Sequence, residues 1–184
     1  KLLELGSGSA AIARALARRA AAKGMPVEIT GSDVVPTYVR DANRRAKEQG
    51  VRATFRLLNA FELAGELRPG DVDVAFIAQS IHHFTPGQIA MMIAQVGAAG
   101  AQRFIGIDGR RGLAVCVALP ILCALSLDRY FVHDAFVSTR RLYSEPELEL
   151  IASIAAPGAR VSVVTDRPFI SVLTVDFTAE GRVP

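Results

Sequence analysis

The sequence predicts an α/β protein with a doubly wound, mostly parallel sheet of seven strands that ends in an antiparallel hairpin. Two observations lead to this prediction. Through residue 109, short apolar segments alternate with amphipathic segments of helical period, as in repeated βαβ units. The last two apolar segments are separated by only Asp166, Arg167 and Pro168, which is too short for a parallel crossover. The length of 184 residues suits a single domain.

The first third of the chain is expected to hold three strands and two helices. Each helical segment has a polar face and is followed by a glycine, Gly24 or Gly50, which is typical of a helix end. The predicted strands are 2–5, 27–31 and 51–58, and the predicted helices are 11–23 and 37–49.

The remainder continues the alternation. The segment 72–78 is almost continuously apolar, as a parallel strand buried on both faces should be. Pro86 suits the first turn of a helix, and Ser144 with Glu147 forms a capping-box pattern at the start of another. The further predicted elements are helices 86–96 and 145–155 and strands 103–107, 160–165 and 169–177.

Residues 113–127 are almost wholly apolar and contain Pro120. This stretch is shorter than the roughly 20 residues that span a bilayer, so no transmembrane segment is expected. We expect 112–143 to form an inserted helical segment that covers an apolar pocket; a core helix or a contact with a membrane surface is the alternative. Cys116 and Cys123 are seven residues apart, about 10 Å on a helix, which favours free thiols in a reducing, cytoplasmic compartment.

Composition and charge exclude several classes of function. The hydrophobic fraction of 51% excludes intrinsic disorder. The net charge of +3 comes from arginines scattered in pairs, with no long basic run and no interleaved aromatic residues. We therefore expect no nucleic-acid partner.

A glycine-rich turn follows the first strand. Gly6 and Gly8 lie between the strand and the next helix, where glycines let the backbone approach a ligand and the helix start attracts an anion. Asp33 stands at the end of the second strand, where a carboxylate can accept hydrogen bonds from ribose hydroxyls. The combination predicts a cofactor that contains a nucleoside.

Four segments in order resemble the class I S-adenosylmethionine-dependent methyltransferases, whose fold is Rossmann-like. Residues 4–10, Glu-Leu-Gly-Ser-Gly-Ser-Ala, resemble motif I of that family, with Ala10 where a third glycine is usual. Asp33 matches the ribose-binding acidic residue, and 58–61 resembles the segment that contacts adenine, with Asn59 in place of the usual Asp. Residues 73–84, ending in His-His-Phe, resemble the fourth-strand motif of the small-molecule branch.

This resemblance implies S-adenosylmethionine as the cofactor and a single methyltransferase domain over 1–184 that lacks the helices usually found before motif I. It places Glu4 near the amino group of the methionine moiety. The implied cofactor-binding residues are Glu4, Gly6, Ser7, Gly8, Asp33, Val34, Asn59, Ala60, Ala78 and Gln79.

Two other interpretations remain open. Gly6, Gly8 and Ala11 also fit a dinucleotide fingerprint, which would indicate an NAD(P)-dependent oxidoreductase, although no Tyr-x-x-x-Lys pair supports it. A non-catalytic scaffold that binds the cofactor is the other alternative, and Asn59 makes it credible.

Four residues are candidates for catalysis. His82 and His83 follow the fourth strand at the edge where open α/β sheets bind ligands, and Asp108 ends the fifth strand at the same edge. His133 is adjacent to Asp134 in the segment after the apolar run. A histidine is suited to act as a general base if the acceptor is a hydroxyl. The three histidines and two cysteines have no metal-ligand spacing, so no metal site is expected.

The residues that follow the fourth strand indicate which class of compound accepts the methyl group. Family members that methylate exocyclic amines usually carry Asn/Asp-Pro-Pro-Tyr/Phe there, and this chain has Ala-Gln-Ser-Ile at 78–81. Together with the apolar stretch 113–127, this favours a small, hydrophobic or aromatic acceptor, methylated on oxygen or carbon.

Overall fold

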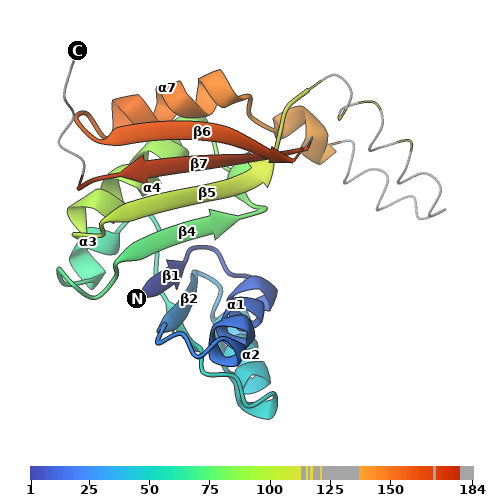
Figure 1. Ribbon diagram of the computed structural model, residues 1–184, viewed down its shortest axis with the longest axis vertical. Coiled ribbons are helices and arrows are strands. Elements are labelled where there is room, and N and C mark those ends of the chain that lie inside the picture. Colours follow the sequence, from blue (N-terminus) through green and yellow to red (C-terminus); the bar gives the residue numbers. More distant parts are fainter. Residues whose placement is uncertain (113–114, 116, 118–120, 122–136, 168, 179–184) are drawn as a thin grey trace.

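The protein is built around one seven-stranded sheet in the order β3-β2-β1-β4-β5-β7-β6 (Figure 1). The computed structural model describes residues 1–112, 115, 117, 121, 137–167 and 169–178. The first five strands run parallel, and β7 is antiparallel to both β5 and β6. The predicted Rossmann-like α/β sheet with a C-terminal hairpin is therefore confirmed. The strands are β1 (Leu2–Glu4), β2 (Ile29–Asp33), β3 (Thr54–Leu57), β4 (Val74–Ala78), β5 (Arg103–Gly109), β6 (Arg160–Arg167) and β7 (Ile170–Asp176).

Every helix predicted by period is present. The capping box predicted for Ser144 and Glu147 forms at the start of one helix. Thr85 and Gln88 form a second capping box, which was not predicted, at the start of another. Two short elements were not predicted, because three or four residues carry no readable period. In the described part of the chain, the helices with defined bounds are α1 (Ala11–Ala22), α2 (Pro36–Glu48), α3 (Leu63–Glu66), α4 (Pro86–Ala98) and α7 (Glu145–Ala155), with a 3₁₀ turn, η1 (Ile81–His83). Residues 137–141 are also helical.

Several strand boundaries differ from the prediction, and those of the second and third strands differ for a local reason. The third strand was expected from residue 51, but the backbone N–H groups of Val51 and Ala53 donate to Ala46 and Val51 in the turn that leaves α2. The second strand was expected over 27–31, but Val27 donates to Met25 in a turn. The strand continues instead to Asp33, because Asp33 pairs with Leu57 of β3.

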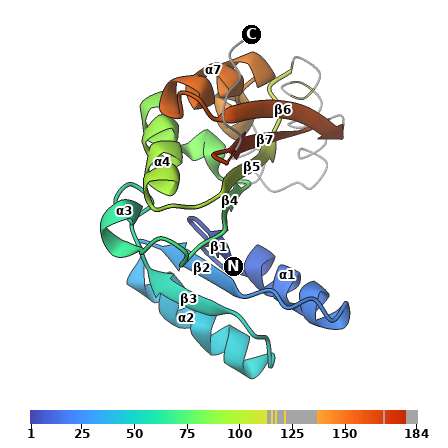
Figure 2. The same ribbon diagram turned by 60° about the vertical axis from the view of Figure 1, so that its left-hand side comes forward.

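The helices cover the sheet from both sides (Figure 2). Leu2 packs with a cluster that includes Ala13 of α1, Ala42 of α2 and Phe55 of β3. Its neighbour Leu3 belongs to the larger cluster formed with α4, α7, β5 and β7. Because successive residues of a strand point to opposite faces, α1 and α2 cover one face and α4 and α7 the other.

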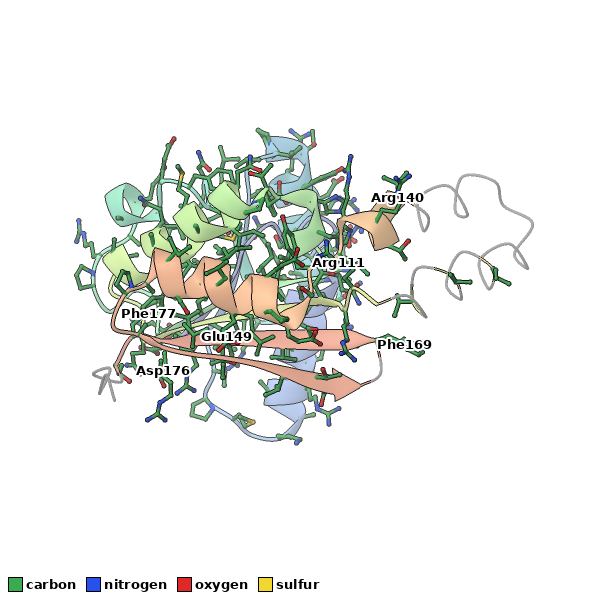
Figure 3. The ribbon with its side chains drawn as sticks, turned by 90° about the horizontal axis from the view of Figure 1, so that it is seen from above. Arg111, Arg140, Glu149, Phe169, Asp176 and Phe177 are labelled. Atoms are coloured by element: carbon green, nitrogen blue, oxygen red, sulfur yellow. The ribbon has the colours of Figure 1, made fainter. Side chains whose placement is uncertain are left out.

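The segments that flank 113–142 are held against the end of the sheet. Arg110 pairs with Glu145 and Arg111 with Glu147 at the start of α7. Figure 3 shows Arg111, Arg140 and Phe169 at one end of the sheet, with Asp176 and Phe177 at the other. The anchored end is therefore the one at which the parallel strands finish.

Several sequence predictions concern residues outside the described part of the chain. Most of the expected cover segment 112–143 lies there, as do His133, Cys116 and Cys123. Within the described residues, no helix combines the length and apolar character that a membrane crossing needs.

Candidate cofactor and active site

The glycine turn predicted from the sequence leaves β1 and opens α1. Gly6 and Gly8 have positive φ angles of 60° and 47°, which favour glycine. A Cβ atom placed on either residue would have no heavy atom within 4 Å, so open space lies over this turn. Ala10 also has a positive φ, 58°, at the position where the resemblance leads one to expect a third glycine. The turn therefore presents bare backbone to a ligand.

Asp33 fixes this turn to the end of β2. Its Oδ2 accepts a hydrogen bond from the backbone N–H of Gly8 at 2.8 Å, and its Oδ1 accepts one from Val35 at 2.9 Å. The side chain is buried, with 8% of the residue exposed. A carboxylate offers about four acceptor positions, so capacity remains for two hydroxyl donors.

A cleft of about 300 Å³ lies in front of Asp33, at the carboxyl ends of the first parallel strands. It includes the predicted cofactor residues Gly6, Gly8, Asp33, Val34, Asn59 and Ala60, and the catalytic candidate His83. The other residues that line it are Leu5, Tyr38, Leu58, Phe61, Ile77, Ser80, Phe84 and Met92.

The cleft wall is largely apolar. Phe61 and Phe84 meet edge to face, with ring centroids 5.8 Å apart. Asn59 shapes the adjoining turn, because its Oδ1 accepts a hydrogen bond from the N–H of Phe61 at 3.1 Å. The sequence indicated the segments of Phe61 and Phe84 but not Tyr38 or Met92, because helix residues carry no local mark of facing a cleft.

A larger hollow, of about 590 Å³, lies at the amino ends of β2 and β3. Alanines of α1 and residues 25–30 and 51–54 line it, and it includes none of the predicted site residues. Ligands of open α/β sheets bind beyond the carboxyl ends of the strands, so the smaller cleft is the candidate site.

Glu4 lies behind the glycine turn rather than in the cleft. The residue is only 3% exposed, and its carboxylate accepts a hydrogen bond from the N–H of Ala13 in the first turns of α1. Burial raises the pKa of Glu4 from 4.5 to about 7, although the Ala13 hydrogen bond acts in the opposite direction.

Asp108 and His82 come together from the ends of β5 and β4. The carboxylate accepts a hydrogen bond from the His82 backbone N–H at 2.9 Å, and its two oxygens lie 3.1 and 2.9 Å from His82 Nδ1. The His82 ring contacts the His83 ring, with centroids 4.2 Å apart. Three of the four catalytic candidates are thus adjacent, and the fourth, His133, lies outside the described residues.

Ser7, Ala78 and Gln79 are predicted cofactor residues that do not line the cleft. Ser7 donates its backbone N–H to Ser32, and Gln79 donates its own to Ile107 of β5. Gln79 has a positive φ of 56°, which is uncommon for a residue with a side chain and turns the backbone sharply after β4. In the described part of the chain, no group of three His, Cys, Asp or Glu side chains could hold a metal ion.

The fold and the cleft together define the class of protein. Residues 2–108, more than half of the chain, match the methyltransferase domain family. The chain therefore belongs to this family, as a class I S-adenosylmethionine-dependent methyltransferase domain. The alternative of an NAD(P)-dependent oxidoreductase is set aside by this membership. No curated protein matches the chain.

Solved structures share the fold at low sequence identity. A SAM-dependent methyltransferase from Aquifex aeolicus is 19% identical, with a TM-score of 0.66 over 95% of this chain and 80% of its own. Magnesium protoporphyrin IX methyltransferase from Synechocystis PCC 6803 with bound SAH is 16% identical, with a TM-score of 0.61 over 95% and 72% of the two chains. The plantazolicin methyltransferase, in complex with a triazolic desmethylPZN analog and SAH, is 13% identical, with a TM-score of 0.68 over 96% of this chain and 76% of its own.

Proposed function

We propose that this protein methylates a small, hydrophobic or aromatic acceptor, and that the cleft in front of Asp33 holds the S-adenosylmethionine. The observation that carries the proposal is the placement of the Asp33 carboxylate between the open glycine turn and the Asn59 turn. When bound, the cofactor supplies a sulfonium methyl group that is activated for in-line displacement. The protein has to bind, orient and exclude water.

The residues present fit such a cofactor. The space over Gly6 and Gly8 admits a ligand to the backbone, and the start of α1 favours its carboxylate. Asp33 can accept hydrogen bonds from the ribose hydroxyls. Asn59 and Ala60, with the Phe61 ring nearby, provide polar and apolar contacts for adenine.

The proposal of a hydrophobic or aromatic acceptor rests on apolar residues in the cleft and in the sequence at 113–127. Phe61, Phe84 and Met92 line the cleft, and the sequence at 113–127 is apolar. The segment 78–81 does not carry the Asn/Asp-Pro-Pro pattern of amine methylation. Solved structures of similar fold include methyltransferases for magnesium protoporphyrin IX and plantazolicin and a putative O-methyltransferase from Nostoc punctiforme, which agrees with a small-molecule acceptor.

Calorimetry tests the cofactor assignment. The protein is titrated with S-adenosylmethionine, S-adenosylhomocysteine and NAD⁺ under the same conditions. We expect binding of the first two and none of NAD⁺. Absence of binding to either sulfur compound would overturn the proposal.

A screen for the acceptor follows once binding is established. Quinones, phenols and acyl compounds are incubated with the protein and methyl-labelled S-adenosylmethionine, and products are identified by mass spectrometry. We expect label in an apolar or aromatic compound. Transfer only to nucleic acid or to protein would contradict the acceptor class.

A further inference from the structure

The hydroxyl of Tyr143 is bound to the backbone of the cleft wall. It donates a hydrogen bond to the carbonyl of Phe84 at 2.8 Å, although the two residues are 59 positions apart in the chain. Phe84 precedes Thr85, the N-cap of α4, so its carbonyl takes no part in the hydrogen bonds of that helix. Tyr143 therefore supplies a partner to a carbonyl that α4 does not use.

Phe84 is part of the cleft itself. Its side chain lines the cleft together with Phe61, and the two rings meet edge to face. The residue lies in the short connection between η1 and α4, where its N–H donates to the carbonyl of Ile81 at 3.0 Å. Because this connection is outside the helices and strands, its position depends on individual hydrogen bonds such as the one from Tyr143.

Tyr143 is in turn held to the end of β5. Its carbonyl accepts a hydrogen bond from the N–H of Arg111 at 3.0 Å, and its backbone forms a parallel bridge with Arg110. The two arginines pair with Glu145 and Glu147 in the first turn of α7. Residues 110–111 and 143–147 thus form a junction between β5 and α7, which we call the β5–α7 junction.

The Tyr143 side chain is suited to act as a fixed donor. Its ring is half-buried and packs against the larger hydrophobic cluster. Burial raises the pKa of Tyr143 above its ordinary value of 10.0, and the Glu147 carboxylate acts in the same direction, while Arg111 opposes them. The phenol is therefore neutral near pH 7 and keeps the proton that it donates to Phe84.

We propose that Tyr143 is a positioning residue for the cofactor, because its hydroxyl keeps Phe84 and one wall of the cleft in the arrangement that binds S-adenosylmethionine. This inference rests on the proposed function, since it requires the cofactor to lie in the cleft. A wall that is held before the ligand arrives gives tighter binding, because less order has to be imposed on it during binding. The coupling is reciprocal, so a ligand of the cleft must also stabilise the β5–α7 junction.

The affinity test uses Tyr143→Phe, which removes the hydroxyl and keeps the ring. Calorimetry with S-adenosylhomocysteine should give a dissociation constant about fivefold higher than that of the wild type, the order of effect of one neutral hydrogen bond. An unchanged dissociation constant in the folded variant would overturn the inference.

Thr165→Val is the matched control. The Thr165 hydroxyl donates to Glu145 at 2.9 Å, so the change removes a hydroxyl hydrogen bond at the same junction but leaves the one between Tyr143 and Phe84 in place. Thr165 does not line the cleft, and its loss should leave the dissociation constant unchanged. Asp71→Asn is a second control, because Asp71 is exposed before β4 and accepts a hydrogen bond from the N–H of Arg68.

A double variant shows whether the hydroxyl acts through Phe84. Phe84→Leu removes the ring that the Tyr143 hydroxyl positions. Added to Phe84→Leu, Tyr143→Phe should therefore raise the dissociation constant less than twofold further. The same fivefold increase in both backgrounds would show that the hydroxyl does not act through this wall.

Hydrogen exchange tests the reciprocal effect and needs no folded variant for its first part. Over times short compared with global unfolding, S-adenosylhomocysteine should slow exchange in wild-type peptides that span 143–147, although these residues do not line the cleft. In Tyr143→Phe at saturating ligand, this protection should be lost. A purely structural role would speed exchange equally with and without ligand.

Absence of ligand-dependent protection at 143–147 in a wild type that binds the ligand would also overturn the inference, with the proposed function intact. If the wild type binds neither S-adenosylmethionine nor S-adenosylhomocysteine, the proposed function itself fails. The two failures are therefore distinguishable.

Discussion

Two buried carboxyl groups, Glu4 and Asp33, stand on either side of the glycine turn but in different environments. Asp33 accepts two backbone hydrogen bonds at the cleft and can accept more from a ligand. Glu4 accepts one, from Ala13, and is otherwise enclosed by protein. The first carboxyl group is therefore suited to binding, whereas the second affects the stability of the fold with pH.

Replacement of Asp33 tests the binding role. In Asp33→Asn the amide offers one acceptor oxygen in place of two, so one donor, from the backbone or the ribose, loses its partner. We expect at least a tenfold loss of affinity for S-adenosylmethionine by calorimetry, since hydrogen bonds to charged groups contribute about 1.5–3 kcal/mol. Asp71→Asn should bind normally. An unchanged affinity in a folded Asp33→Asn variant would remove Asp33 from the site.

Replacement of Glu4 tests the effect of burial. The folded-state pKa of Glu4 is raised from 4.5 to about 7, so between these values the folded protein holds a proton that the unfolded chain has released. This group therefore lowers the free energy of unfolding as pH rises from about 4.5 to 7, and the loss is complete above 7. Glu4→Gln stays neutral, so its free energy of unfolding relative to that of the wild type should rise by on the order of 3 kcal/mol between pH 4 and pH 8.

Urea unfolding at the two pH values measures this difference. A stability difference between Glu4→Gln and the wild type that is the same at both pH values would contradict the assignment.

At the scale of elements, the close packing of neighbouring strands limits which residue can stand at a given position of a strand. Gly31 of β2 stands opposite Phe55 of β3 in the sheet. A Cβ atom on Gly31 would lie 2.5 Å from two carbons of the Phe55 ring, and that ring is buried. Asp33 follows two residues later on the same strand and pairs with Leu57 of β3.

The prediction for this contact is a loss of stability. Gly31→Ala should lower the free energy of unfolding by about 1–3 kcal/mol, since overpacking forces a buried ring to move. Gly65→Ala in α3 is the control, because its Cβ would meet no atom within 4 Å and the backbone there needs no positive φ. Combining Gly31→Ala with Phe55→Leu should lose less than the sum of the two single changes. Additive losses would show that the two residues do not interact.

At the scale of the whole molecule, the cleft depends on the complete parallel half of the sheet. Its residues come from the ends of β1, β2, β3 and β4 and from α2 and α4, so the site exists only when these elements are assembled. A ligand of this cleft must therefore bind the folded state alone, and its binding must stabilise the fold.

Thermal unfolding tests this coupling. S-adenosylhomocysteine at 100 times its dissociation constant should add about 2.7 kcal/mol to the free energy of unfolding and raise Tm, whereas NAD⁺ should have no effect. Calorimetric scans with and without ligand measure the shift. In Asp33→Asn the shift at the same ligand concentration should be smaller. No shift in the wild type would contradict binding in the cleft.

Much of the fold and part of the site could be predicted from local patterns. The glycine turn, Asp33 and Asn59 follow successive parallel strands, and parallel strands end at one edge of a sheet, so their meeting in the cleft was predictable. The start of β3 was not, because backbone hydrogen bonds in the turn after α2 decide it. The elements α3 and η1 were not, because three or four residues carry no readable period. Tyr38 and Met92 line the cleft because of how α2 and α4 pack against the sheet, which no local pattern predicts.

The sequence by itself determined the class of fold, the family resemblance and the cofactor turn, because these depend on residue period and on glycine and carboxylate positions along the chain. Only the tertiary structure decided how the polar groups pair. His82 and Asp108 are 26 residues apart, and their contact requires β4 and β5 to lie side by side. The raised pKa of Glu4 likewise arises from burial beneath α1, which no local pattern records.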